Sequence, residues 1–82
     1  MKSNYREQLY AMEAAIEQLS GTIEPLGSLK AAFLFYGGDS ARFSYYLDRM
    51  LDNRKDVRIV YDRVPGWYTT VMVEIDAMRR ET

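Results

Sequence analysis

The segment best suited to binding a ligand is Tyr36-Gly37-Gly38-Asp39-Ser40, where a glycine pair precedes a predicted helix. Backbone amides at the start of a helix can hold the phosphate of a nucleotide or another small anion. Neither the dinucleotide-binding nor the P-loop glycine pattern accompanies the pair, and Asp39 would repel a phosphate. A flexible turn with a helix cap is therefore the better interpretation, and the segment remains the alternative ligand loop.

Ser40 is the nucleophile that this loop offers, and the chain lacks the base that a serine needs. No histidine occurs in the sequence, and only Lys30 and Lys55 could substitute for one. No cysteine is present to act as a thiolate, a disulfide partner or a zinc ligand. We therefore expect a protein that is not an enzyme and that has no catalytic residue, no cofactor and no metal.

Carboxylates recur at spacings that could hold a cation or act in pairs. Asp48 and Asp52 lie one turn apart on a predicted helix, with Asp56 just beyond it, as ligands of magnesium or calcium can. Basic residues interleave with all three, so a solvated face with local ion pairs is the better interpretation. Glu74 and Asp76 share one face of a predicted strand, but a chain this short hardly forms the cleft that a glycosidase needs.

Length and composition predict one domain that covers residues 1–82. The chain has 82 residues, of which 48% are hydrophobic and 28% are charged, an ordinary balance for a globular domain. Without a disulfide or a metal clip, a core of this size gives modest stability. Self-association as a homodimer is one way to stabilise such a domain.

Charge and hydropathy exclude several classes of partner. Eleven basic and twelve acidic residues give a net charge of −1, and both signs are interspersed along the chain. Nucleic-acid binding needs a basic excess that releases counterions from phosphates, so we expect no nucleic-acid partner. Single-stranded nucleic-acid binding by aromatic stacking would be possible only if folding gathers the arginines on one side. No apolar run approaches the ~18 residues of a membrane span, and no signal peptide is recognisable. We expect a cytoplasmic protein without a membrane partner.

Two amphipathic helices should position these groups. The first is predicted from Asn4 to Leu19, with a cap at Asn4 and a glycine stop at Gly21. The second is predicted from Asp39 or Ser40 to about Asn53. The first helix packs its apolar stripe on the rest of the domain or, as the alternative, in a helix–helix dimer seam. That stripe has spacings of four and three: Tyr5, Leu9, Met12, Ile16 and Leu19.

Three further segments are predicted as strands. Leu29–Tyr36 is a short apolar run between glycines, Val57–Tyr61 is β-branched, and Thr69–Ala77 has five β-branched residues among its first seven. Leu29–Tyr36 and Thr69–Ala77 also match a helical spacing, so both stay open between strand and helix. Thr22–Ser28 and the Pro65-Gly66 turn are predicted as connections.

The predicted fold is a single small α+β domain with the order α-β-α-β-β and a three-stranded mixed sheet. Strand, helix and strand from Leu29 to Tyr61 would form a right-handed crossover, and the last strand would pair antiparallel with its predecessor. The loop between the last two strands is expected to span about Asp62 to Tyr68. The alternative is an all-α bundle of four or five short helices.

Tyrosine and arginine offer a binding surface in place of reactive groups. Seven tyrosines and eight arginines are present, and these types dominate binding hot spots because each gives a large contact with defined donors. Tyr5, Tyr46 and Tyr61 lie on apolar stripes and are expected in the core. One predicted protein-binding patch lies on the outer side of the second helix and another around the Pro65-Gly66 turn: Arg42, Tyr45 and Arg49 in the first, and Arg63, Trp67 and Tyr68 in the second.

These observations favour a small non-enzymatic module that binds another protein. No motif is specific enough to assign a family. The size and the lack of catalytic groups suit an inhibitor or adaptor of the kind that phages and mobile elements carry. A nucleotide or small-anion binder that uses Tyr36–Ser40 is the alternative.

Overall fold

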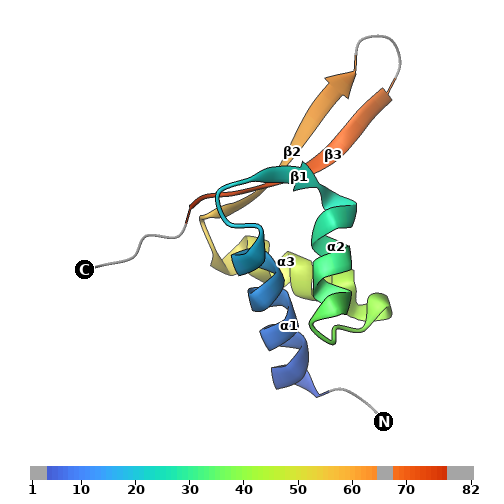
Figure 1. Cartoon of the computed structure of the whole chain (residues 1–82), viewed down its shortest axis with the longest axis vertical. Helices are drawn as coiled ribbons and strands as arrows, with labels where there is room; N and C mark the ends of the chain where they lie inside the picture. The colour runs from blue at the N-terminus through green and yellow to red at the C-terminus, as the bar shows by residue number, and fades with distance from the viewer. Residues whose placement is uncertain (1–3, 65–67, 78–82) are drawn as a thin grey trace, which may run out of the picture.

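The structure of the protein is a computed structural model that describes residues 4–64 and 68–77, with side chains up to residue 61 and from residue 71. A short 3-10 turn leads directly into the third helix. The helices are α1 (Tyr5–Gln18), α2 (Leu26–Phe35) and α3 (Phe43–Asn53), with the 3-10 turn at Ser40–Arg42. The strands are β1 (Ile23–Pro25), β2 (Val57–Val64) and β3 (Tyr68–Ile75), as Figure 1 shows.

The predicted α+β class and the order α-β-α-β-β are confirmed. The described residues form three helices and one three-stranded antiparallel sheet. Two helices, α2 and α3, lie between β1 and β2 in the chain, where one helix was predicted. The strand order is β1-β3-β2, and the last strand pairs antiparallel with its predecessor, as predicted. The all-α alternative is wrong.

The prediction of a strand over Leu29–Tyr36 is wrong, because this segment lies mostly in α2. Its buried residues Leu29, Ala32 and Phe33 follow a helical spacing of three and four. A run this short and apolar suits a buried strand and a buried helix equally, so the pattern did not separate them. The mixed sheet and its right-handed crossover are wrong for the same reason, since the first strand is Ile23–Pro25 and pairs antiparallel with β3.

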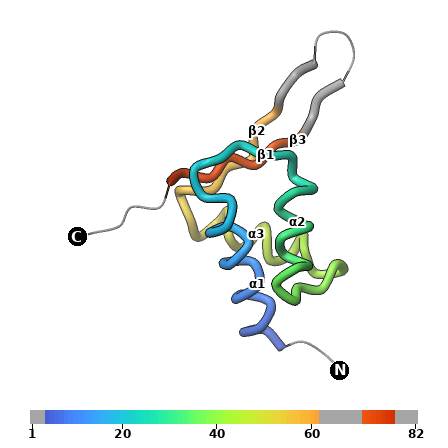
Figure 2. Tube along the Cα trace, in the orientation of Figure 1, coloured from blue at the N-terminus to red at the C-terminus, as the bar shows by residue number. Residues whose placement is uncertain are grey.

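The segment predicted as a connection contains β1. Gly21 has a φ of 80°, a left-handed conformation that turns the chain out of α1. The Gly21 amide donates to the Ile75 carbonyl at 2.8 Å, and the Ile75 amide donates to the Thr22 carbonyl at 3.0 Å. These bonds attach the end of α1 to β3, and Figure 2 traces the two segments side by side. A strand of three residues is stable here because β3 holds it.

The helices α1 and α3 form as predicted, and side-chain caps precede both. The Asn4 side chain accepts a hydrogen bond from the Glu7 amide at 2.8 Å. The Asp39 side chain accepts one from the Ala41 amide at 3.0 Å, at the start of the 3-10 turn before α3. A cap of this kind contributes about 1 kcal/mol, because it satisfies an amide that the helix leaves free.

The core lies between the helices and one face of the sheet. Phe33 is fully buried, and its ring centre is 5.6 Å from that of Phe43. Tyr46 is buried as predicted, whereas Tyr5 and Tyr61 are exposed, so their predicted core positions are wrong. The buried apolar residues come from all three helices and from β2 and β3: Ala11, Met12, Ala15, Ile16, Leu29, Ala32, Phe33, Phe43, Tyr46, Leu47, Met50, Val57, Val73 and Ile75.

The hairpin of β2 and β3 extends beyond the helices (Figure 1). The two strands pair along their whole lengths, and the last pair is Val64 with Tyr68. The predicted loop from Asp62 to Tyr68 is therefore too long, because pairing with β3 continues through position 64. The Pro65-Gly66 turn itself lies outside the described residues. Tyr61 lies on the part of β2 that extends beyond the helices, so it is 68% exposed.

Candidate functional site

The structure brings together the patch predicted on α3, which consists of Arg42, Tyr45 and Arg49. These residues are three and four positions apart, so they lie on one side of the helix. Tyr45 is 55% exposed, Arg42 is exposed and Arg49 is half-buried. The neighbouring Tyr46 points into the core instead, which leaves the patch free to contact a partner.

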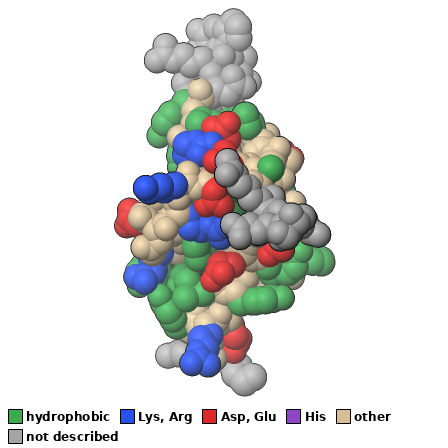
Figure 3. Space-filling model, turned by 90° about the vertical axis from the view of Figure 1, so that its left-hand side faces the viewer, with side chains coloured by type: hydrophobic (Ala, Val, Ile, Leu, Met, Phe, Trp, Pro, Cys, Tyr) green, Lys and Arg blue, Asp and Glu red, His purple; other side chains and the backbone are tan. Residues whose placement is uncertain are grey.

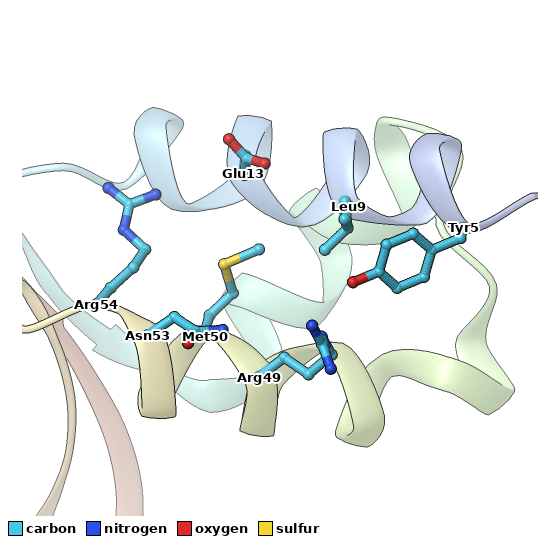
Figure 4. Close-up of a pocket in the computed structure, with 7 residues that line it drawn as sticks. All are labelled: Tyr5, Leu9, Glu13, Arg49, Met50, Asn53 and Arg54. Atoms are coloured by element: carbon cyan, nitrogen blue, oxygen red, sulfur yellow. The ribbon is translucent and has the colours of Figure 1, made fainter.

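Tyr5 at the start of α1 completes this surface, which we call the Tyr–Arg surface (Tyr5, Arg42, Tyr45 and Arg49). The guanidinium carbon of Arg49 lies 5.6 Å from the centre of the Tyr5 ring and 5.9 Å from that of Tyr45. A cation over an aromatic ring gains about 0.5–1 kcal/mol at an exposed site. The rings therefore hold the direction of the Arg49 side chain, which reaches from α3 toward Tyr5 in Figure 4.

Sequence reasoning missed Tyr5 as a surface residue. It begins the apolar stripe of α1, which predicted burial, but it is 45% exposed and its ring centre lies 5.8 Å from that of Tyr46. The available signal was its position in the first turn of α1, because the end of a helix can extend past the core that its middle covers.

One donor of the Tyr–Arg surface has no acceptor. The Nε atom of Arg49 is buried and makes no hydrogen bond within the described part of the chain. Buried polar groups of native proteins almost always have a partner, which is supplied by protein, water or ligand. A partner would contact the part of this half-buried side chain that stays exposed, so Arg49 is a candidate contact residue of the surface.

A groove runs between α1 and α3 beside Arg49. A second hollow also borders Tyr5, and each has a volume of about 390 Å³. Tyr5 therefore joins the two into one basic and aromatic surface. The groove is lined by Tyr5, Leu9, Glu13, Arg49, Met50, Asn53 and Arg54 (Figure 4), and the hollow by Tyr5, Arg42, Tyr45 and Tyr46.

At the other end of the groove the charge of Arg54 is already neutralised. Arg54 donates from Nε and Nη2 to the two carboxylate oxygens of Asp56, at 2.9 and 2.8 Å. The hydrogen bond raises the pKa of Arg54 and lowers the pKa of Asp56. Glu13 and Glu17 on α1 add further attraction to Arg54. Arg54 therefore stabilises the join between α3 and β2 and is less available to a partner than Arg49.

The carboxylates predicted to share a strand face, Glu74 and Asp76, both contact Arg58 on β2. Arg58 donates from Nε to Glu74 at 3.2 Å and from Nη2 to Asp76 at 2.5 Å. The bond to Asp76, followed by that to Glu74, raises the pKa of Arg58, and the bond from Arg58 lowers the pKa of Asp76. Acidic and basic side chains lie next to one another on the face that Figure 3 shows. The pair is thus engaged in an ion cluster, as expected of a polar sheet face.

The alternative ligand loop, Tyr36–Ser40, uses its amides inside the protein. It follows the helix α2 and not a strand, and Gly37 has a φ of 98° just after that helix. The two glycine amides complete a Schellman motif, which satisfies the last carbonyls of α2. Three amides that could hold an anion are thus occupied: Gly37 donates to Leu34 at 3.0 Å, Gly38 to Phe33 at 2.8 Å and Asp39 to Gln8 at 2.8 Å.

Asp39 and Ser40 serve local structure in this loop. The Asp39 side chain caps the 3-10 turn that Ser40 begins, and its carboxylate lies 3.7 Å from Arg42. A phosphate would meet this negative charge. Lys30, one of the two bases considered for Ser40, places its Nζ 6.0 Å from the centre of the Phe43 ring. The geometry favours a helix cap here and not a phosphate site.

The remaining predicted groups are less informative. Within the described ranges, no three acidic side chains are placed to hold a metal ion, so Asp48, Asp52 and Asp56 form no such cluster. In the second predicted patch, Arg63 lies on β2 and Tyr68 begins β3. Trp67 lies outside the described residues.

No family model, no curated protein and no solved structure matches this chain. No helix in residues 4–64 and 68–77 combines the length and the apolar character that crossing a bilayer requires. The basis for a functional proposal is therefore the Tyr–Arg surface and the helices that carry it.

Proposed function

We propose that this protein binds double-stranded DNA in the cytoplasm, with α3 as the helix that enters the major groove. The helix α2 and the helical segment that begins at Ser40 are joined by four residues, Tyr36–Asp39, which include two glycines. Two helices joined by a turn of this length are typical of a helix-turn-helix unit. In Figure 1, α2 runs from top to bottom of the picture and α3 runs across it, as such a unit requires.

The observation that carries the proposal is the position of the Tyr–Arg surface on the second helix of this unit. In helix-turn-helix proteins, residues in the N-terminal part of the second helix reach the base edges. Arg42 and Tyr45 lie in the first turns from Ser40, and Arg49 follows one turn later. Arginine suits the paired acceptors of guanine and the oxygens of phosphate, and the hydroxyl of tyrosine suits phosphate.

The hairpin of β2 and β3, which carries residues of the second predicted patch, also suits DNA binding. Two-stranded ribbons also fit DNA grooves. Arg63 on β2 and Tyr68 on β3 lie in the outer half of the hairpin. We therefore propose that the hairpin supplies additional contacts beside those of α3.

The net charge of −1 led us to expect no nucleic-acid partner, but binding depends on the local surface and not on the sum over the chain. Arg54 and Arg58 are engaged with carboxylates and contribute little to such a surface. On the second helix Arg42 and Arg49 remain, and Arg42 has a long ion pair of 3.7 Å with Asp39. With two cations on the Tyr–Arg surface we expect about two to four phosphate contacts, which give a slope of about −2 to −4 for log K against log salt.

Fluorescence anisotropy with a random-sequence duplex of about two helical turns tests this proposal. We expect binding at about 50 mM salt that weakens steeply toward 200 mM. Arg42→Ala and Arg49→Ala should each lose about tenfold in affinity. Lys55→Ala is the matched control, because it removes the same charge from an exposed position outside the groove and the hollow. Absence of binding at low salt, or an equal loss in Lys55→Ala, would contradict the proposal.

The second candidate is the protein-binding function predicted from the sequence, as an inhibitor or adaptor that blocks or recruits another protein. The specific support is the groove beside Arg49 and the adjoining hollow, which the half-exposed ring of Tyr5 borders on both sides and the half-exposed ring of Tyr45 on one. Aromatic rings and arginine around a groove are typical of binding hot spots. A carboxylate on the partner would satisfy Arg49.

A tagged pull-down from the native cell, with nuclease treatment, separates the two candidates. A protein that wild type retains after nuclease treatment and that both Tyr45→Ala and Arg49→Ala lose would favour protein binding. Lys55→Ala serves as the control, since Lys55 lies outside the groove and the hollow. A partner that is released by the nuclease would favour DNA binding instead.

A further inference from the structure

We propose that β2 pairs with β2 of a second copy of this chain, antiparallel and about a two-fold axis at Val60, so that two sheets join into one. The proposal is independent of DNA binding and of the protein-binding groove. It rests on the two edges of the sheet, on the charges along β2 and on the exposed apolar residues of the hairpin.

The two edges of the sheet differ in how open they are to pairing. The order β1-β3-β2 places β1 at one edge and β2 at the other. β1 has only three residues and ends in Pro25, which has no amide proton to donate. β2 has eight residues from Val57 to Val64, without a proline. A long edge strand without a proline is a template for pairing with a strand whose charges complement its own.

The charge pattern of β2 selects a second copy as the occupant. With the axis at Val60, position 58 lies opposite position 62 of the partner, so the register pairs an arginine with an aspartate on both sides of the axis. An axis at Ile59 would instead put aspartates 56 and 62 opposite each other, which is unfavourable.

The same register covers apolar surface that the monomer leaves in water. Tyr61 is 68% exposed and Val71, its cross-strand neighbour on β3, is 37% exposed. Both continue the face of the sheet that is buried at Val57 and Val73. With the axis at Val60, Tyr61 lies opposite Ile59 of the partner. Because the strands are antiparallel, the helices of one copy lie toward the hairpin end of the other.

A single introduced cysteine tests the axis directly, because the chain has no cysteine of its own. Directly opposed residues of an antiparallel pair have Cα atoms about 4.5 or 5.5 Å apart, within the range of about 4.4–6.8 Å for disulfides. We expect Val60→Cys to form a covalent dimer quickly under mild oxidation. Asp52→Cys, at an exposed position on α3, is the matched control and should stay monomeric on a denaturing gel. Equal cross-linking of the two variants would overturn the proposal.

Sedimentation velocity over a range of concentrations, without DNA, tests the association itself. Wild type should sediment as a dimer, and Asp62→Lys should shift the equilibrium to monomer by about tenfold or more, because it places two like charges opposite each other at each end. Asp52→Lys makes the same charge change away from the edge and should leave the dimer intact. A monomeric wild type at all concentrations, or a dimer that Asp62→Lys leaves unchanged, would overturn the pairing.

Discussion

The turn Tyr36–Ser40 and the Tyr–Arg surface, which begins on the following helix, differ in whether their hydrogen-bond donors have acceptors within the protein. In the turn, the amides of Gly37, Gly38 and Asp39 all donate to acceptors within the protein. On the Tyr–Arg surface, the Nε donor of Arg49 is buried and has no acceptor among the residues that the structure describes.

The difference separates groups that hold the fold from groups that remain for a partner. A donor that is satisfied internally would have to break its bond before it could hold an anion, so the turn offers little to a ligand. The half-buried Arg49 side chain is held by the rings of Tyr5 and Tyr45, and contact with a partner would not break a backbone hydrogen bond of the fold. The glycine pair resembles a ligand loop in the sequence, yet the arginines on the following helix are better placed to contact a partner.

The largest effect that we expect is on the turn, from Gly38→Ala. A Cβ atom at this position would overlap the ring of the fully buried Phe33. The ring must shift, so the free energy of unfolding should fall by about 3 kcal/mol in chemical denaturation. Gly27→Ala is the control, because its Cβ would meet nothing within 4 Å. Similar stability of wild type and Gly38→Ala would show that the turn does not pack on the core in this way.

The next largest effect should come from Gln8→Ala on α1. Gln8 is fully buried, and its Oε1 accepts the hydrogen bond of the Asp39 amide. Without this acceptor the amide is unsatisfied, so we expect a loss of about 2 kcal/mol in thermal unfolding. Gln18→Ala on the same helix removes an exposed hydrogen bond from Tyr36. It should lower the stability by less than half of the loss expected for Gln8→Ala. Equal losses in the two variants would mean that the turn does not depend on Gln8.

Tyr45→Ala should separate binding from stability. Tyr45 is 55% exposed, so its removal should change the free energy of unfolding by about 0.5 kcal/mol or less. DNA affinity, measured by anisotropy, should fall about tenfold, because the ring also directs Arg49. Tyr45→Phe keeps the ring and should retain most of the affinity. A large loss of stability in Tyr45→Ala would place this residue with the fold and not with the partner.

The smallest effect on stability should come from Asp39→Asn. Asparagine caps a helix about as well as aspartate, so unfolding should change by about 0.5 kcal/mol or less. The substitution removes the negative charge that lies 3.7 Å from Arg42. We expect DNA affinity to rise a few-fold in a parallel titration of variant and wild type. A fall in affinity would mean that Asp39 itself contacts the partner.

The sequence allowed a correct prediction of the elements with clear periodicity and missed those that tertiary contacts decide. The stripe of α1, the apolar face of α3 and the β-branched run of β2 each identify their element, whereas the run of β3 favoured a strand without excluding a helix. α2 is short and apolar on most sides, so its pattern fits helix and strand alike. β1 is held by bonds from Gly21 and Ile75 that are far apart in the chain, and no local pattern reports them.

In the candidate site, too, the sequence predicted what depends on local spacing and missed what depends on tertiary contacts. The spacing of Arg42, Tyr45 and Arg49 predicted one face of α3, because helical spacing is a local property. By contrast, the ion pairs of the arginines depend on residues that are far apart in the chain. Arg58 finds Glu74 and Asp76 only through the register of β2 with β3. The contribution of Tyr5 likewise depends on how α1 lies against α3.

The position of β3 has a consequence for how the protein is made. It is the central strand of the sheet and also its last element, so Ile23 pairs with Glu74. A ribosome releases the chain from its N-terminus, so β1 and β2 emerge before the strand that both need. The sheet can close only when the chain through Ile75 is outside the exit tunnel. Folding is therefore completed after synthesis of the described elements, and a chain that stops before Met72 would leave two strands without their shared neighbour.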